Sequence, residues 1–208
     1  MRQGDTFGGI IRVIAGTSVR VITHPVAFFQ TMPKQGGFRA PFVFLLVIGL
    51  FDMLLLSLLQ AVVMGPAGGL AFAERAFALA PIALTVSGFV LTTVFFVFWR
   101  LMGSSQSYET AYRTFAYSYG ISPLTTILGF FPYVSLIGFL WWFSLLVIAS
   151  VYVHGVSRFK ATFVFGVLAV ALLVFIGRAE HYMVRHRLGP VPHAARMASQ
   201  TPAGAARV

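Results

Sequence analysis

The sequence contains no cysteine, which excludes disulfide bonds, thiolate metal sites and thiol chemistry. Acidic residues are scarce as well: five Asp and Glu residues stand against fifteen Lys and Arg residues, and only 10% of the 208 residues are charged. A soluble domain of this length needs a charged surface, because apolar side chains that face water promote aggregation. So few charges cannot supply that surface. We therefore expect an integral membrane protein.

Motifs for catalysis and nucleotide binding are missing too. The sequence has no phosphate-binding loop, no dinucleotide fingerprint and no pair of carboxylates at a spacing suited to acid–base catalysis. Ser157 follows His154 closely, but no acid is near in sequence and no G-x-S-x-G turn is present. The sequence also lacks an HExxH motif. We predict no enzyme activity, no cofactor and no metal site.

Apolar runs make up most of the chain, which is 58% hydrophobic with a mean hydropathy of +0.86. A helix of about 20 apolar residues crosses a lipid bilayer. The runs predict an all-α, polytopic membrane bundle over residues 41–177, with five transmembrane helices at about 41–64, 77–101, 110–129, 134–153 and 161–177. The third helix is unusually polar. Ser107 is its expected N-cap, and Pro123 is expected to kink it.

Basic segments flank the predicted bundle. In residues 1–40, apolar residues recur at helical spacing and Arg12 and Arg20 fall among the polar positions. This pattern predicts an amphipathic segment on the cytoplasmic membrane surface, although a helix packed on the rest of the protein explains it equally well. Residues 178–208 are predicted to form a basic, largely disordered tail. The net charge of +10 is concentrated in these flanks and in short connections, which favours anionic lipid headgroups over nucleic acid.

The distribution of charge leaves two topologies open. A cytoplasmic N-terminus and five crossings place Arg100, Arg113, Arg158 and Lys160 inside, as the positive-inside rule expects, but they place the basic tail outside. If the polar third helix does not cross, four crossings return the tail to the inside and move Arg158 and Lys160 outside. The charges alone favour four crossings. The family resemblance described below favours five.

Asp52 is the only acidic residue within a predicted span. Insertion scales give a cost of about 2.5–3.5 kcal/mol for a charged group at a helix centre, so Asp52 should face protein or water. Two interpretations remain open: a site that couples to protons, cations or a basic partner, and a packing residue near Gln60, two turns further along the same face. On the third helix, Tyr117, Ser118 and Pro123 are predicted to form a polar seam or a partner contact.

Charged residues near the ends of the predicted spans are candidates for contact with lipid headgroups. Glu109 and Arg113 are four residues apart and are expected to pair on one helix face, a contact typically worth about 0.3–0.5 kcal/mol when exposed. His154 and Lys160 flank a predicted helix junction, where they can reach phosphates. The complete set of interface candidates is Arg12, Arg20, Glu109, Arg113, His154, Arg158, Lys160 and Arg178.

Three segments carry a resemblance to a known family. The first has a proline, paired phenylalanines, a turn and a glycine pair before the first span: His24-Pro25, Phe28-Phe29, Met32-Pro33, Gly36-Gly37 and Pro41. The second lies in the third helix, with Tyr112-Arg113, Ala116-Tyr117-Ser118 and Pro123. The third precedes the last span, with His154-Gly155-Val156-Ser157 and Lys160-Ala161. In this order and spacing, over about residues 24–177, the chain resembles the Ypt-interacting-protein (Yip) domain family.

The resemblance implies a five-helix membrane domain with a cytosolic N-terminus. Eukaryotic members of the family are scaffolds that interact with small GTPases of the Rab class. This chain lacks their long cytosolic N-terminal region, which argues against GTPase binding. Its basic residues are overwhelmingly Arg, with Lys34 and Lys160 the only lysines, and Ala, Gly and Val are abundant. This bias suggests a GC-rich bacterial gene and hence the inner membrane.

The expected function is that of a non-enzymatic membrane scaffold or accessory subunit, which contacts lipids and other membrane proteins, including those of a larger complex. One alternative is a small transporter or exporter component that uses Asp52 and the polar third helix. A second alternative is a lipid-handling protein centred on the basic junctions.

Overall fold

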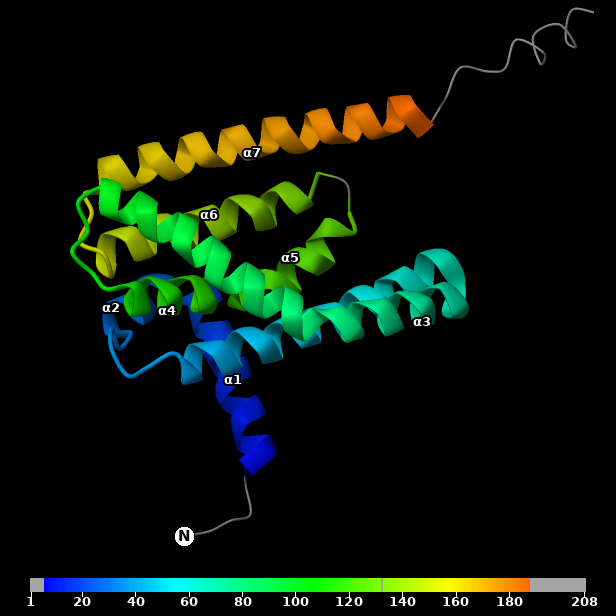
Figure 1. Ribbon diagram of the computed structural model, residues 1–208, viewed down its shortest axis with the longest axis horizontal. Helices are drawn as coiled ribbons and strands as arrows, with labels where there is room; N and C mark the ends of the chain where they lie inside the picture. The colour runs from blue at the N-terminus through cyan, green and yellow to red at the C-terminus, as the bar shows by residue number, and fades with distance from the viewer. Residues whose placement is uncertain (1–5, 132, 188–208) are drawn as a thin grey trace, which may run out of the picture. The chain divides into compact units, whose positions relative to one another are not determined.

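The computed structural model describes residues 6–131 and 133–187, and all regular structure in these residues is helical. The elements are α1 (Thr6–Thr23), α2 (Pro25–Thr31), α3 (Arg39–Leu101), α4 (Tyr108–Ser118), the 3₁₀ turn η1 (Tyr119–Ile121), α5 (Ser122–Gly129), α6 (Ser135–Tyr152) and α7 (Arg158–Arg187) (Figure 1). One compact unit ends at Gly166, and a second begins at Val167, within α7. The all-α prediction is confirmed.

The element α3 is a hairpin of two helical arms that run side by side in opposite directions (Figure 1). The helical path breaks at Gly65, whose φ of 79° and ψ of 168° suit a residue without a side chain. Pro66 then begins the second arm, where its missing N–H costs no hydrogen bond. Further along the hairpin, Gly49 of the first arm lies against the side chain of Leu84 in the second. The absence of a side chain at Gly49 therefore lets the arms approach closely.

The turn of this hairpin is shorter than the sequence predicts. The predicted spans end at about residue 64 and begin again at about residue 77, but the helix resumes directly at Pro66. A Cβ atom at Gly69 would collide with the backbone of Ala61 in the first arm. The small residues at this end therefore serve the closure of the hairpin itself. Pro81, near the start of the predicted second span, lies in the interior of the second arm.

The polar third helix is interrupted, as Pro123 predicts. Helix α4 passes into the 3₁₀ turn η1, and α5 begins at Ser122 with Pro123 in its first turn. A proline fits there because the first N–H groups of a helix have no intrahelical partner. Ser107 caps α4, since its Oγ accepts a hydrogen bond from the N–H of Thr110 at 3.2 Å. Both the predicted cap and the predicted break are confirmed.

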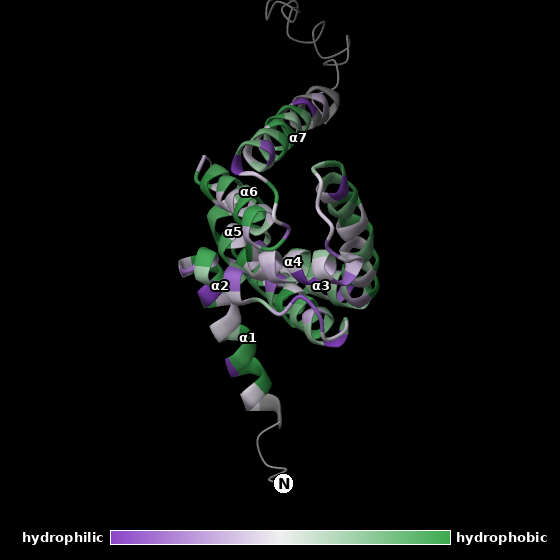
Figure 2. Ribbon diagram, turned by 90° about the vertical axis from the view of Figure 1, so that its left-hand side faces the viewer, coloured by the Kyte–Doolittle hydropathy of each residue, from purple (hydrophilic) through white to green (hydrophobic). Residues whose placement is uncertain are grey.

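Within residues 6–131 and 133–187, three helices are long and apolar enough to cross a membrane: α3, α6 and the part of α7 from Arg158 to Ile176. Helices α1 and α2, bent by 119° at their junction, would add a fourth if they formed one span. Each arm of α3 also exceeds the length of about 20 residues that a crossing needs. In Figure 2 the hydrophobic colour dominates the long helices. The membrane-helical class is therefore confirmed, and the five-span arrangement remains a prediction.

One face of α1 packs against the protein. Ile14, Ser18 and Val21 are buried at helical spacing, whereas Ile10 and Ile11 are exposed. The chain then turns at Pro25, which begins α2. Val21 belongs to a core cluster with residues of α2, η1, α6 and their ends, namely Phe29, Met32, Ile121, Leu145, Ala149 and Val153. This packing fits the interpretation of α1 as a docked helix; membrane contact through its exposed residues stays a prediction.

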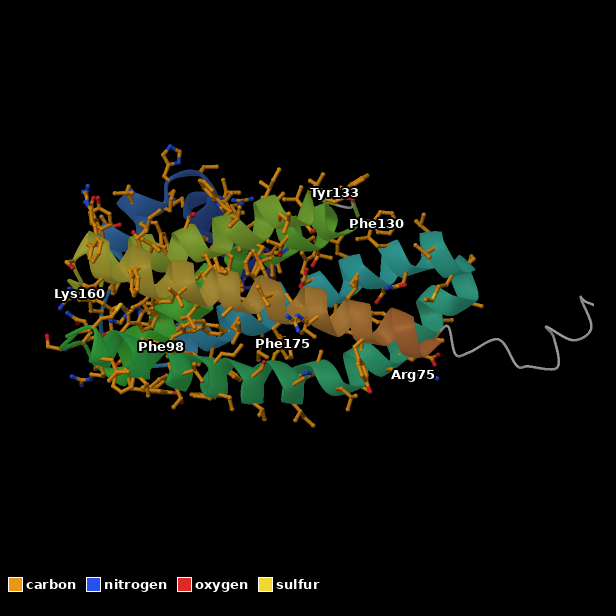
Figure 3. The ribbon with its side chains drawn as sticks, turned by 90° about the horizontal axis from the view of Figure 1, so that it is seen from above. Arg75, Phe98, Phe130, Tyr133, Lys160 and Phe175 are labelled. Atoms are coloured by element: carbon orange, nitrogen blue, oxygen red, sulfur yellow. The ribbon has the colours of Figure 1, made fainter. Side chains whose placement is uncertain are left out.

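The two ends of the compact unit that ends at Gly166 can be followed in Figure 3. Lys160 lies at one end, and Arg75, on the second arm of α3 near its turn, lies at the other. The connections at residues 32–38, 102–107 and 153–157 meet at the Lys160 end through hydrogen bonds.

At the C-terminus, residues 178–187, predicted as part of the disordered tail, continue α7, and residues 188–208 lie outside the described residues.

Candidate functional site

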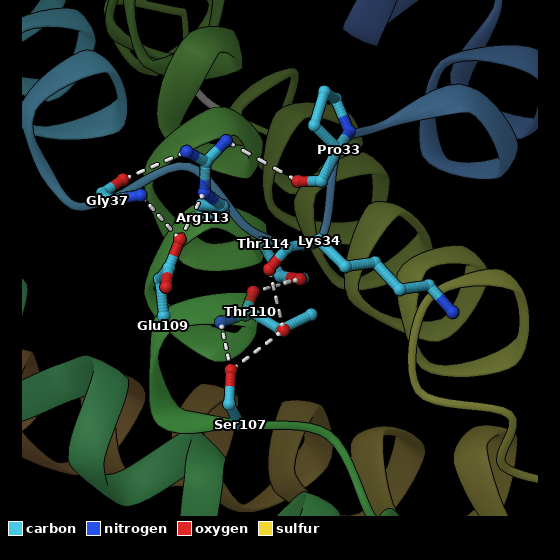
Figure 4. A network of polar contacts seen from close by, with 8 residues as sticks. All are labelled: Pro33, Lys34, Gly37, Ser107, Glu109, Thr110, Arg113 and Thr114. Atoms are coloured by element: carbon cyan, nitrogen blue, oxygen red, sulfur yellow. Dashed lines mark hydrogen bonds and ion pairs between the residues drawn. The ribbon is translucent and has the colours of Figure 1, made fainter.

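A polar network, centred on the buried Arg113, joins α4 to the exposed loop before α3, and we call it the latch (Figure 4). The latch consists of Glu109, Thr110 and Arg113 on α4 and of the loop residues 33–37. The Arg113 side chain is buried, with 4% of the residue exposed. Its Nε donates to Oε1 of Glu109 at 3.2 Å, Nη2 donates to the carbonyl of Gly37 at 2.9 Å, and Nη1 donates to the carbonyl of Pro33 at 3.4 Å. The forked guanidinium therefore has a partner on each nitrogen.

Glu109 completes the latch from the same helix. Its Oε1 accepts a hydrogen bond from the N–H of Gly37 at 2.7 Å in addition to the bond from Arg113. The Oγ1 of Thr110 donates to the carbonyl of Lys34 at 3.0 Å. Carboxylate, guanidinium and hydroxyl thus bind the backbone of one short loop, with charge-assisted bonds that are stronger than neutral ones. The loop is held in register with α4 although 72 residues separate Gly37 from Glu109.

The loop can follow this path because it carries two glycines. Gly36 has a φ of +127° and Gly37 a φ of +81°, in the region that side chains disfavour. A Cβ atom on Gly36 would lie 2.9 Å from Nη2 of Arg113. Any larger residue at Gly36 would therefore disturb both the backbone and the guanidinium. The glycine pair that carries part of the family resemblance has a direct physical role in the latch.

A second buried cluster lies at the same end and contains His154, which directly follows the C-terminal end of α6. The imidazole stacks on the ring of Trp99 with centroids 3.9 Å apart and planes 11° apart. Nδ1 lies 3.1 Å from Oγ of Ser104, and Nε2 lies 3.4 Å from Oγ1 of Thr114. The indole N–H of Trp99 donates to Oγ of Ser150 at 2.7 Å. His154 thereby ties α6 to the second arm of α3 and to α4.

His154 is held in its neutral form. Burial, and to a smaller extent the positive charge of Lys34, lowers the pKa of the imidazole to about 3. A neutral imidazole has one nitrogen that donates and one that accepts, and each nitrogen has a hydroxyl within reach. The site therefore suits a structural histidine, and it lacks the exposure that a proton donor to solvent needs.

A third polar group lies on the first arm of α3, away from the latch. Asp52 is buried, and Ser122, Thr126 and Tyr119 lie close enough for their hydroxyls or charges to affect its carboxyl. Asp52 Oδ1 and Ser122 Oγ nevertheless make no direct hydrogen bond. We call these four residues the Asp52 cluster. Gln60, the partner suggested by spacing, is half-buried two turns along the same arm.

The interface candidates divide into two groups. Arg12, Arg20, Arg158, Lys160 and Arg178 are exposed, as contact with lipid requires. Arg113 and His154 are buried and Glu109 is bonded within the latch, so their side chains do not reach a headgroup in this structure. On the third helix Ser118 is buried and Tyr117 half-buried.

Sequence reasoning missed two features of the site. The partners of Arg113 are backbone carbonyls far away in sequence, which no side-chain pattern reveals. The pairing of Trp99 with Ser150 and His154 joins residues about 50 positions apart. A usable signal was present for the latch alone: a glycine pair before a span, together with an acid and a base in a polar helix that otherwise needs buried partners.

Comparison with known proteins identifies the family. The model of the Yip1 domain family matches residues 19–178, which is well over half of the chain. No curated protein and no solved structure matches the chain. The match covers the latch, the His154 cluster and the Asp52 cluster.

Proposed function

Because the chain belongs to the Yip1 domain family, we propose that it is a non-enzymatic integral membrane scaffold or accessory subunit. It acts by binding: other membrane proteins dock against its apolar helix faces, and anionic lipids contact its exposed bases. The family match and the apolar helices make it a membrane protein. We further propose that the protein lies in the bacterial inner membrane, that its N-terminus is cytoplasmic and that the chain crosses the membrane five times.

The observation that carries this proposal is the distribution of side chains in the compact unit: large apolar side chains are exposed, and polar side chains are buried between helices. Large apolar side chains are exposed along the arms of α3, for example Val62 at 76%, Ile82 at 67% and Leu101 at 78%. Such surfaces need lipid or partner helices. The buried charges and polar side chains of the latch and the His154 cluster, by contrast, hold helices together. The arrangement supports a rigid body that presents helix faces, which is what a scaffold requires.

Five crossings follow if each arm of α3 crosses once and the broken element α4–η1–α5 crosses once, together with α6 and α7. The buried position of α4 supports this count, because a polar helix can cross a membrane when protein surrounds it. A reporter fused at the C-terminus tests the number of crossings. Five crossings from a cytoplasmic N-terminus predict an external signal, and a cytoplasmic signal would support four.

The decisive experiment is recovery of partners from membranes in mild detergent with the tagged full chain. Double neutralisation of the exposed bases, Arg158→Gln with Lys160→Gln, is expected to reduce the retention of anionic lipids seen by native mass spectrometry. Arg75→Gln, at the opposite end, is the matched control. A reproducible co-purifying membrane protein supports the scaffold. Recovery of the chain alone, with no dependence on these bases, would contradict it.

A small transporter or exporter component is the second candidate, favoured by Asp52, a buried acid in a span whose Oδ1 has no hydrogen-bond partner. Buried ionisable groups in spans commonly mark ion pathways. Flux into liposomes that contain only this protein would support transport, provided that Asp52→Asn abolishes it. Absence of flux together with a stable complex would favour the scaffold.

A further inference from the structure

Asp52 lies midway along the first arm of α3, and one oxygen of its carboxyl, Oδ1, has no hydrogen-bond partner. Only 6% of the residue is exposed, and its Oδ1 makes no hydrogen bond. Among the described residues, the one ion pair is that between Arg113 and Glu109, so no base neutralises Asp52. A buried carboxylate in apolar surroundings is costly unless something compensates its charge. The site as it stands is therefore incomplete.

The residues opposite Asp52 are hydroxyl-bearing. Ser122 and Thr126 of α5 and Tyr119 of η1 lie beside the carboxyl. The Oγ of Ser122 is also buried and also makes no hydrogen bond. Two neighbouring polar atoms from different elements are thus both unsatisfied. Such pairs are rare in folded proteins, where buried polar atoms find a partner in the protein or in a bound molecule.

The chemistry of these groups indicates which kind of ligand would bind between them. All four side chains offer oxygen, and oxygen ligands suit hard cations. One carboxylate supplies a single negative charge, which a single positive charge balances. A divalent ion would leave an uncompensated charge inside the span and normally requires more carboxylates. The helix break at η1 adds a feature typical of ion sites in membrane proteins, where irregular backbone is tolerated beside a bound ion.

We propose that Asp52, Ser122, Thr126 and Tyr119 bind one monovalent cation of the Na⁺ class between the first arm of α3 and the η1–α5 segment. The ion joins two elements that otherwise contact through unsatisfied groups. Binding here requires neither transport nor a partner protein, so the proposal stands or falls independently of the scaffold function.

Thermal unfolding of the purified full chain in detergent tests the site, with NaCl titrated against choline chloride at constant ionic strength. Na⁺ is expected to raise the unfolding temperature in a saturable manner, because a ligand that binds the folded state stabilises it. Asp52→Asn, which keeps the shape but removes the charge, should abolish the response. Ser122→Ala should weaken the apparent affinity for Na⁺ by about tenfold or more.

The matched control is Glu74→Gln, which removes an exposed acid near the turn of α3 and should leave the Na⁺ response unchanged. Equal stabilisation by choline, or a Na⁺ response that survives in Asp52→Asn, would overturn the proposal. So would stabilisation by acid without any response to Na⁺, since Asp52 would then hold a proton. If Asp52→Asn fails to fold, direct ²²Na⁺ binding to the wild-type chain and to Ser122→Ala decides the question.

Discussion

Arg113 and Asp52 are both buried charged residues, yet their surroundings are opposites. Arg113 is 4% exposed, and each nitrogen of its guanidinium has a partner. Asp52 is 6% exposed, and one of its oxygens has none. The two side chains are buried to a similar degree. They differ in their hydrogen bonds, because every nitrogen of the guanidinium has a partner and one carboxyl oxygen has none. Burial of a charge alone therefore does not indicate function; the informative quantity is what the charge still lacks.

This difference separates structural from functional candidates in the molecule. The charged side chains of the latch bind the backbone of one loop and each other, so no charged group of the latch remains to bind a ligand. The Asp52 cluster keeps two polar atoms unsatisfied inside a span. Mutations at the two sites should consequently affect stability with different magnitude and even different sign.

The largest effect is expected from Arg113→Met. Removal of the guanidinium leaves two carbonyls without this partner and leaves Glu109 with the N–H of Gly37 alone. Because Glu109 is 25% exposed, the loss should approach but not exceed the roughly 3–5 kcal/mol that breaking a fully buried pair costs. Denaturant unfolding in detergent measures the loss. Arg12→Met, at an exposed position of α1, should change stability little. An Arg113→Met variant as stable as the wild type would show that the latch is dispensable.

A smaller loss is expected from Gly36→Ala. The alanine must adopt a φ of +127° and its Cβ would approach Nη2 of Arg113, so we expect a cost of about 1–2 kcal/mol. Gly16→Ala is the matched control, because Gly16 lies in α1 with open space around its Cβ position, where alanine favours the helix. The same unfolding measurement compares both variants. Equal stability of the two would contradict the strained path of the loop.

A pH titration tests the third buried ionisable group, His154. Its pKa is lowered to about 3 in the folded protein, from an ordinary value of 6.5. Between these values the unfolded chain binds a proton that the folded chain does not. Stability should therefore fall as pH decreases below about 6.5, by about 1.4 kcal/mol per pH unit, and the contribution should be unaffected by pH above that value.

Replacement of His154 by Gln should flatten this dependence, because Gln keeps polar contacts and does not titrate. His24, which is exposed, provides the control variant His24→Gln, and the slope should persist there. Persistence of the slope in His154→Gln would assign the titration to another group.

The smallest change is expected from Asp52→Asn measured without Na⁺. Loss of an unpartnered buried charge should leave stability within about 1 kcal/mol or raise it, because the desolvation cost disappears. The change in stability is thus expected to be smaller than that of Arg113→Met or opposite in sign, and unfolding in choline chloride measures it. A loss of stability as large as that from Arg113→Met would show that Asp52 is as fully hydrogen-bonded as Arg113. The proposed difference between the two sites would then be wrong.

Periodicity and turn residues predicted much of the fold. The positions of α6 and of the break at Pro123 follow from local rules about apolar length and proline. The turn at Gly65 was placed correctly, but its length was not, because the fit of Gly69 against Ala61 depends on the packing of the two arms. The position of α1 against α6 likewise depends on distant residues such as Leu145.

The sites were predictable only in part. The spacing of Glu109 and Arg113 indicated a pair, but an exposed one, since the carbonyl partners in the loop at residues 33–37 carry no residue-specific signal. Asp52 stood out by its charge, whereas its neighbours Ser122 and Tyr119 lie about 70 residues further along the chain. Spacing along one helix instead suggested Gln60. Contacts between helices decide which polar residues meet, and a single sequence does not encode them locally.

The latch also imposes an order on biosynthesis. Gly37 leaves the ribosome 72 residues ahead of Glu109, a delay of roughly 4–14 s at ordinary rates of translation. The α3 hairpin closes on itself and can pair its arms during that interval. The N-terminal segment has to wait for α4 before its loop can be fixed. A nascent chain stopped before Arg113 should thus carry a paired hairpin and a loop at residues 33–37 that is not yet fixed. Full docking of the N-terminal segment, which also packs against Leu145 of α6, requires synthesis of α6 as well.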